Sequence, residues 1–197
     1  MKSVKGSFLI AAPHLVDPNF LRTVVFVIEH NPQGAFGLVI NRPSGLEVGK
    51  LWEAIGGEPI SCPWRAFVGG PVEKSAVFLL HSFADLADGA DPIVPGVWLG
   101  QERELFAALI DRVTSANASA SSSGSSVPAP FRVFCGYAGW GEGQLDSELE
   151  TGSWLVQPAS AELILAPETD DLWQKALEGQ GGAYSLFARM PENPELN

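Results

Sequence analysis

The residues with the greatest capacity for chemistry lie close together, between Gly136 and Trp154. This stretch, GYAGWGEGQLDSELETGSW, holds five glycines, two tryptophans and four acidic side chains. Such a mixture is compatible with a glycine-rich loop that binds phosphate, with a carboxylate site for acid–base or metal chemistry, or with a tightly packed turn. The spacing of the residues distinguishes the three.

The spacing does not fit a phosphate-binding loop. A G-x-G-x-x-G motif that began at Gly139 or Gly141 would need another glycine at position 144 or 146, where Gln144 and Asp146 stand. The negative charges of Glu142 and Asp146 would also repel an anion from the start of a helix there. We therefore do not expect phosphate binding in this stretch.

The acidic residues lack the pattern of a catalytic or metal site. Asp146 and Glu150 would share a helical face at i,i+4, an arrangement that could hold a proton or a cation between them. The stretch has no EF-hand spacing, however, and no histidine is near it in the sequence. A solvated helix surface is the simpler interpretation, and no metal or cofactor is expected.

The histidines offer one further catalytic hypothesis. His14, His30 and His81 are isolated from one another, and no zinc-binding H-E-x-x-H motif is present. His30 and Ser82 each follow a predicted strand and could meet as a base and a hydroxyl. No G-x-S-x-G nucleophile motif supports that idea, so we interpret the histidines as structural.

A packed turn accounts for the stretch best. We expect the chain to leave a buried strand at Tyr137 and to turn sharply, because glycine permits positive φ and close approach of the backbone. Trp140 and Trp154 would fill the space left by the missing side chains, and Leu145 and Leu149 would anchor a following helix. Such a turn could still border a pocket, since open sheets bind ligands where strands end and helices begin.

Hydrophobic patterning predicts the elements that position this turn. The predicted strands are 8–12, 23–29, 37–41, 66–68, 76–80, 97–99, 132–137 and 154–157, with a hairpin between the second and third. The predicted helices are 46–55, with a capping box at Ser44 and Glu47, 101–113, and 170–178, with Gly179 as its cap. This succession indicates an α/β (α+β) fold, with a mixed sheet that has helices packed on both faces.

One long segment interrupts the pattern. Residues 114–130, TSANASASSSGSSVPAP, contain seven serines and no charge, so we expect a disordered loop there. The 67 residues that follow are a thin basis for a second core, which favours one domain over 1–197 with a loop insertion at about 114–130.

Composition restricts the partners and the location. The 197 residues carry 23 acidic and 12 basic side chains, a net charge of −11, and the basic residues are spread along the chain. Nucleic acid binding is therefore not expected, since it requires a basic surface. Two cysteines without a paired motif, no signal peptide and no apolar run of membrane-spanning length indicate a cytosolic protein without a membrane segment.

Three segments resemble a known family. They are GSFLIAAPHLVDPNFLRTVVFVIEHNPQGAFGLVINRPSG at 6–45, FVGGPVEKSAVFLLHS at 67–82 and RVFCGYAGWGEGQLDSELETGSWLVQP at 132–158. Together the motifs DPNF, EHN, GLVINRP, GGP, LHS and GYAGWGxGQL resemble the YqgE/AlgH family of bacterial and plastid proteins over almost the whole chain. His14, where a glycine is more usual, and the serine-rich insertion depart from the family pattern.

The resemblance implies one compact domain with a mixed sheet and flanking helices. Members have been labelled transcriptional regulators, but the resemblance supplies no agreed catalytic residues, ligand or cofactor. Several signature positions are polar, aromatic or glycine and are not explained by core packing alone. These candidates for binding a ligand or partner are Asn41, Arg42, Gly69, Gly70, His81, Trp140 and Gln144.

Three functions follow as hypotheses. The leading one is a non-enzymatic cytosolic regulatory or binding module, in which some of the seven candidates line one groove for a small molecule or a protein segment. The alternative is transcriptional regulation through DNA. The third is a hydrolase that uses His81 or the acidic helix.

Overall fold

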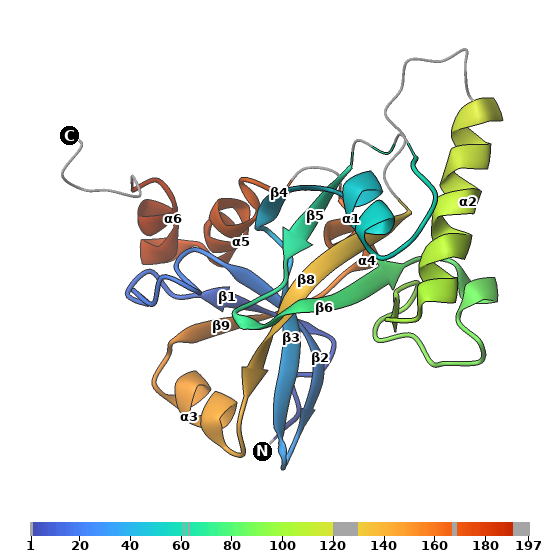
Figure 1. The fold of residues 1–197 in the computed structure, drawn as a ribbon. Helices are drawn as coiled ribbons and strands as arrows, with labels where there is room; N and C mark the ends of the chain where they lie inside the picture. Colours follow the sequence, from blue (N-terminus) through green and yellow to red (C-terminus); the bar gives the residue numbers. More distant parts are fainter. Residues whose placement is uncertain (1, 61, 63, 120–129, 167–168, 191–197) are drawn as a thin grey trace.

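The computed structural model describes residues 2–60, 62, 64–119, 130–166 and 169–190, which form one domain (Figure 1). The described strands are β1 (Ser7–Ala11), β2 (Val24–Asn31), β3 (Gly34–Val39), β4 (Pro43–Glu47), β5 (Arg65–Val68), β6 (Val72–His81), β7 (Trp98–Gly100), β8 (Phe131–Trp140) and β9 (Trp154–Pro158). The helices are α1 (Val48–Ala54), α2 (Arg103–Ser119), α3 (Gln144–Glu150), α4 (Ala161–Ile164), α5 (Leu172–Gln180) and α6 (Gly182–Ala188), with a 3-10 turn at Ala84–Leu86.

The sheet consists of two halves that share β8. One half has the order β9-β1-β2-β3-β8, and all its pairs are antiparallel. In the other half β8 lies antiparallel to β6 and parallel to β5, while β4 and β7 extend the two sides. The first part of β8 pairs with β5 and β6, and its last three residues pair with β3. The parallel pair makes the sheet mixed, as predicted.

The two halves meet where the connection from β5 to β6 crosses β8. Gly69, Gly70 and Gly136 lie buried at this crossing, where the Gly69 N–H donates to the Cys135 carbonyl at 2.9 Å. A Cβ added at Gly70, whose φ is +157°, would lie 2.1 Å from the carbonyl carbon of Tyr137. Gly136 has a φ of +73°, and the register between β6 and β8 shifts at this point. The backbones cross this closely only because the three residues lack side chains.

Helices cover both faces of the sheet, as predicted. On one face Phe131 and Val133 of β8 pack with the buried sides of α1 and α2. On the other, Phe134 belongs to a larger core that includes β1, β2 and β3 and the buried residues of α4 and α5. Alternate residues of one strand therefore supply two cores, which is the side-chain period expected of a fully covered strand.

The sequence located most elements but missed β4, α4 and α6, and four of its predictions differ from the structure. β8 runs on to Trp140 instead of ending at Tyr137, because its last residues pair with β3. The predicted capping box is wrong: Ser44 lies in β4, and Glu47 caps α1 without a side-chain hydrogen bond. α5 continues past the predicted cap to end before Gly181.

The fourth difference concerns the predicted disordered loop. Residues 114–119 of it continue α2 as helix, and 120–129 lie outside the described residues. No helix within the described part of the chain is both long and apolar enough to cross a membrane.

The glycine crossing gives a stability prediction. Gly70→Ala places a methyl group inside the backbone of β8 and should lower the free energy of unfolding by about 3 kcal/mol or more, since neither strand can withdraw without breaking its ladder. Gly141→Ala is the control: an added Cβ meets nothing within 4 Å, and the change should stay within about 0.5 kcal/mol. Urea unfolding followed by circular dichroism measures both, and equal losses would contradict the close crossing.

Candidate functional site

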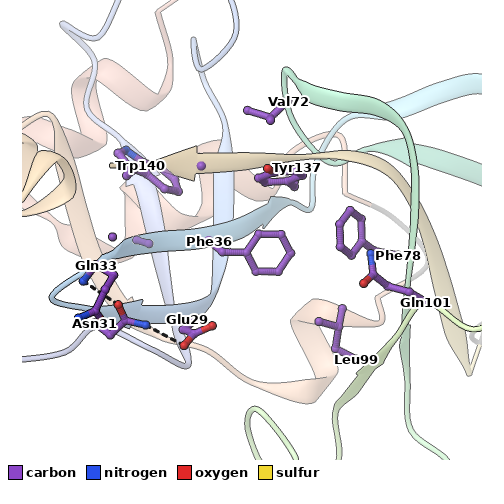
Figure 2. Close-up of a pocket in the computed structure, with 13 residues that line it drawn as sticks. Glu29, Asn31, Gln33, Phe36, Val72, Phe78, Leu99, Gln101, Tyr137 and Trp140 are labelled. Atoms are coloured by element: carbon purple, nitrogen blue, oxygen red, sulfur yellow. Dashed lines mark hydrogen bonds between the residues drawn. The ribbon is translucent and has the colours of Figure 1, made fainter. Parts of the chain in front are cut away.

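An open groove lies over the region where the two halves of the sheet diverge (Figure 2). Its volume is about 690 Å³. The apolar part of its lining comes from Phe36 on β3, Val72 and Phe78 on β6, Leu99 on β7 and Tyr137 on β8, and the polar part from Glu29, Asn31, Gln33 and Gln101. Gly34, Ala35, Gly139 and Trp140 complete the lining.

Three aromatic rings form the centre of the groove. The ring of Phe36 lies 5.3 Å from that of Phe78 and 5.1 Å from that of Tyr137, and the last two are 5.8 Å apart between centroids. The rings are tilted or edge-on to one another, which are the favourable geometries for aromatic pairs. Phe36 and Tyr137 are half-buried, so the cluster offers apolar surface to the groove.

The groove has a flat floor because β8 carries a glycine there. Gly139 pairs with Phe36 across the strands, and a Cβ added to it would lie 3.1 Å from Cε2 of Tyr137. The Tyr137 ring therefore lies over a position without a side chain. Gly139 is exposed, which leaves the backbone of β8 accessible from the groove.

One carboxylate stands beside the aromatic cluster. Glu29 is the cross-strand partner of Phe36, so the two side chains lie on the same face of the sheet. The Asn31 amide donates to Glu29 Oε1 at 2.8 Å, and the Gln33 backbone N–H donates to Asn31 Oδ1 at 2.9 Å. This chain of hydrogen bonds fixes the polar end of the groove at the tip of the β2–β3 hairpin (Figure 2).

The opposite face of β8 contributes to a closed polar cluster with α3 and β9. Glu148 Oε2 accepts hydrogen bonds from the indoles of Trp140, at 2.9 Å, and Trp154, at 2.7 Å, and Glu148 Oε1 accepts from the Gln144 amide at 2.9 Å. The two indoles pack edge to face against each other, and Phe20 stacks on Trp140. Glu148, assigned to a solvated surface by the sequence, is thus half-buried and fully engaged.

A second contact on this face joins His30 to Asp146. Nε2 of His30 lies 3.1 Å from Asp146 Oδ1, a close contact that is not aligned as a hydrogen bond. His30 Nδ1 accepts from the backbone N–H of Val4 at 3.2 Å, so the neutral ring carries its proton on Nε2, toward the carboxylate. His30 and Ser82 do not contact each other: Ser82 Oγ donates to the Pro130 carbonyl at 3.2 Å.

Asn41 and Arg42 hold the loop that precedes β2. The Asn41 side chain accepts from Val24 N–H at 2.8 Å and donates to the Arg22 carbonyl at 2.9 Å. The Arg42 guanidinium donates to three carbonyls of this loop, those of Pro18, Asn19 and Leu21. Both side chains are therefore committed to backbone groups of their own chain.

The glycine pair follows Val68, whose N–H donates to the Arg42 carbonyl at 2.9 Å, but it does not form a site with the Asn41 and Arg42 side chains. Gly69 and Gly70 form the crossing of β8 described above. His81 is 1% exposed, stacks on Trp98 and accepts the Phe83 N–H on Nδ1 at 3.3 Å. Burial lowers the pKa of His81, so the ring is held in its neutral form.

Trp140 and Gln144 are the two candidates whose side chains meet at one group, the Glu148 carboxylate. Trp140 is also the one of the seven candidates that appears among the lining residues of the groove. Strand alternation turns its indole to the opposite face, so its backbone is what borders the groove. The groove residues Glu29, Phe36 and Tyr137 were not predicted. Phe36 and Tyr137 resemble core residues in the sequence and are distinguished only by their exposure, while Glu29 resembles an ordinary polar residue at the end of a strand.

The sequence also gave no signal for a buried cation. Arg132 is 5% exposed on β8, donates to the carbonyls of Ile40 and Ala166, and lies over the Phe67 ring at 4.4 Å. Burial lowers the pKa of Arg132 to about 10, which leaves the guanidinium charged at neutral pH. No group of three or more His, Cys, Asp or Glu side chains suited to a metal ion occurs among the residues that the structure describes.

Comparisons with known proteins place the chain among relatives of its full length. The family model described as AlgH-like matches residues 8–185. A UPF0301 protein of Chlorobium luteolum is 38% identical over 193 residues, covering 98% of this chain and 94% of that protein. A UPF0301 protein of Thermobifida fusca is 37% identical, with coverage of 99% and 96%.

Two solved structures are also similar. The solution structure of the AlgH protein from Pseudomonas aeruginosa is 31% identical and superposes with a TM-score of 0.64, covering 98% of this chain and 100% of that one. A crystal structure of a Corynebacterium diphtheriae protein has a TM-score of 0.67 at 22% identity, covering 95% and 93%. This last likeness concerns the fold alone.

The carboxylate between the indoles gives a second stability prediction. Glu148→Ala leaves the N–H groups of Trp140 and Trp154 buried without an acceptor and should lower the free energy of unfolding by about 2–3 kcal/mol. Glu148→Gln keeps one acceptor oxygen and should lose less, while exposed Glu150→Ala should change stability by under about 0.5 kcal/mol. Chemical denaturation followed by tryptophan emission measures all three.

The buried imidazole gives a prediction about pH. Unfolded His81 takes up a proton near pH 6.5, whereas the folded ring resists protonation because its pKa is lowered. The stability that His81 contributes is therefore present above about pH 6.5 and is lost as the pH falls below that value. His81→Asn keeps an acceptor near Nδ1 but does not titrate, so it should lose less stability than the wild type between pH 7.5 and 5.5. Equal losses in urea unfolding would contradict the assignment.

Proposed function

The chain belongs to the AlgH-like family, as its motifs predicted, and we propose that it is a non-enzymatic binding module whose groove receives an aromatic or apolar side chain of a partner protein. The observation that supports this most is the cluster of Phe36, Phe78 and Tyr137 at an open groove. Half-buried rings gain free energy when a partner covers them, at about 25 cal/mol for each Å² of apolar surface. A pocket that is mostly apolar with a few converging polar groups is the usual form of a binding site.

The groove favours binding over catalysis. Its polar side chains are one carboxylate, three amides and the Tyr137 hydroxyl, and its lining residues include no serine, cysteine or histidine. A hydrolase needs a nucleophile or an activated water with a base beside it. His81, the residue named for that role by the sequence, is buried away from the groove with its Nδ1 occupied.

The DNA-binding alternative gains no support from this site. The charged group at the rim of the groove is the carboxylate of Glu29, which repels phosphate. A regulatory role through a protein partner remains part of our proposal. A cytosolic location stays a prediction from the sequence.

Titration with a small aromatic probe tests the proposal. N-acetyl-L-phenylalaninamide should shift the backbone amide resonances of Ala35–Gly37 and Tyr137–Gly139, whereas N-acetyl-L-alaninamide should not. Phe36→Leu should weaken binding of the aromatic probe by about fivefold, because it removes the ring pairs and keeps an apolar side chain. Phe187→Leu on α6 is the matched control, an exposed ring outside the groove. Shifts scattered over the surface, or equal affinity for Phe36→Leu, would contradict the proposal.

A further inference from the structure

The groove carries a negative charge, which comes from the carboxylate of Glu29. Glu29 stands directly across from Phe36 and is exposed, and its Oε1 is held by the Asn31 amide. Cross-strand partners have Cβ atoms about 4.5–5.5 Å apart, so the carboxylate adjoins the aromatic cluster. A ligand that lies on the rings therefore meets a negative charge at the hairpin end of the groove.

That charge is not neutralised within the described part of the chain. No lysine, arginine or histidine nitrogen of the described residues forms an ion pair with Glu29, and the residues that line the groove include no basic side chain. The net charge of −11 adds a long-range field of the same sign. Both features favour a cationic group on the ligand.

Building on the proposed function, we propose that the occupant is an extended segment of another protein that carries a basic residue close to an aromatic one. The basic side chain pairs with Glu29, and the aromatic side chain lies against Phe36, Phe78 and Tyr137. In an extended segment, side chains two positions apart lie on the same side, separated by about 7 Å, which suits neighbouring sites on one sheet face.

The two longer segments outside the described residues do not have the required chemistry. Residues 120–129, ASSSGSSVPA, contain no basic or aromatic side chain, and residues 191–197, PENPELN, contain two glutamates and neither kind. A second copy of the chain also has a net charge of −11, so the two copies would repel each other. A basic segment of a different protein therefore fits the groove best.

Two peptides that differ only in charge test the inference. In acetyl-Gly-Arg-Gly-Phe-Gly-amide and its citrulline analogue the side chains have the same shape, but citrulline is neutral. Measured by NMR titration of the full-length protein at low salt, the arginine peptide should bind about threefold more tightly, the size expected of an exposed ion pair. The preference should shrink at 0.5 M salt because the charges are screened.

Matched variants separate Glu29 from the overall charge. Glu29→Gln should abolish the preference for arginine, whereas Glu150→Gln removes the same charge from α3 on the other side of the sheet and should retain it. Equal affinity for the two peptides, or an equal effect of the two variants, would overturn the cationic specificity and leave the aromatic groove in place. Failure of both peptides and of N-acetyl-L-phenylalaninamide to bind would overturn the proposed function as well.

Discussion

The structure depends on one strand that serves two half-sheets. β8 pairs with β5 and β6 along its first part and with β3 at its end, and the change of partners requires two backbones to cross at contact distance. Gly69, Gly70 and Gly136 permit that crossing because a Cβ at any of them would lie within 3 Å of the other backbone. The crossing sets where the two half-sheets separate. The groove opens beside it, and Val72 and Tyr137 at the crossing belong to its lining.

The two faces of β8 differ at its C-terminal end, where one is covered by packed side chains and the other borders the open groove. On one face Glu148 accepts hydrogen bonds from both indoles and from the Gln144 amide, so these three donors are satisfied within the chain. On the other face Gly139 has no side chain and is exposed, and the half-buried rings of Phe36 and Tyr137 lie beside it in the groove. Strand alternation separates the two surfaces by a single residue, Gly139 from Trp140. The closed cluster and the open groove therefore lie on opposite faces of the C-terminal end of β8.

The sequence predicted the fold well because the fold follows from local patterns. Alternation and turn residues located the β2–β3 hairpin and α2, and the motifs identified the family. The expectation that glycines allow close backbone approach is confirmed at Gly136, although Gly141 meets no neighbour and the strand does not end where expected. These errors arose because the pairing of β8 with β3 joins residues about 100 positions apart, which no local pattern records.

The groove was less predictable, for a related reason. Asn41, Arg42 and Gln144 stand out in the sequence because polar residues in apolar surroundings suggest chemistry, yet in the structure they hydrogen-bond to neighbouring groups of their own chain. Phe36 and Tyr137 look like ordinary core residues in the sequence, and their partial exposure depends on their place at the groove between the two half-sheets. The exposure of a side chain between two half-sheets depends on the tertiary structure, which local sequence patterns do not record.

The indole pair also reveals how strongly the five antiparallel strands curl. In the order β9-β1-β2-β3-β8 three strands separate Trp154 from Trp140, yet their rings are 5.9 Å apart. The two edge strands of this half-sheet, β9 and β8, thus lie near each other, as in an incomplete barrel. The gap between them is closed by side chains and α3 and not by backbone hydrogen bonds between the strands. Two hydrogen bonds from strand residues to one carboxylate are easier to break than a run of paired strands, so local opening of this barrel is expected to begin along that seam.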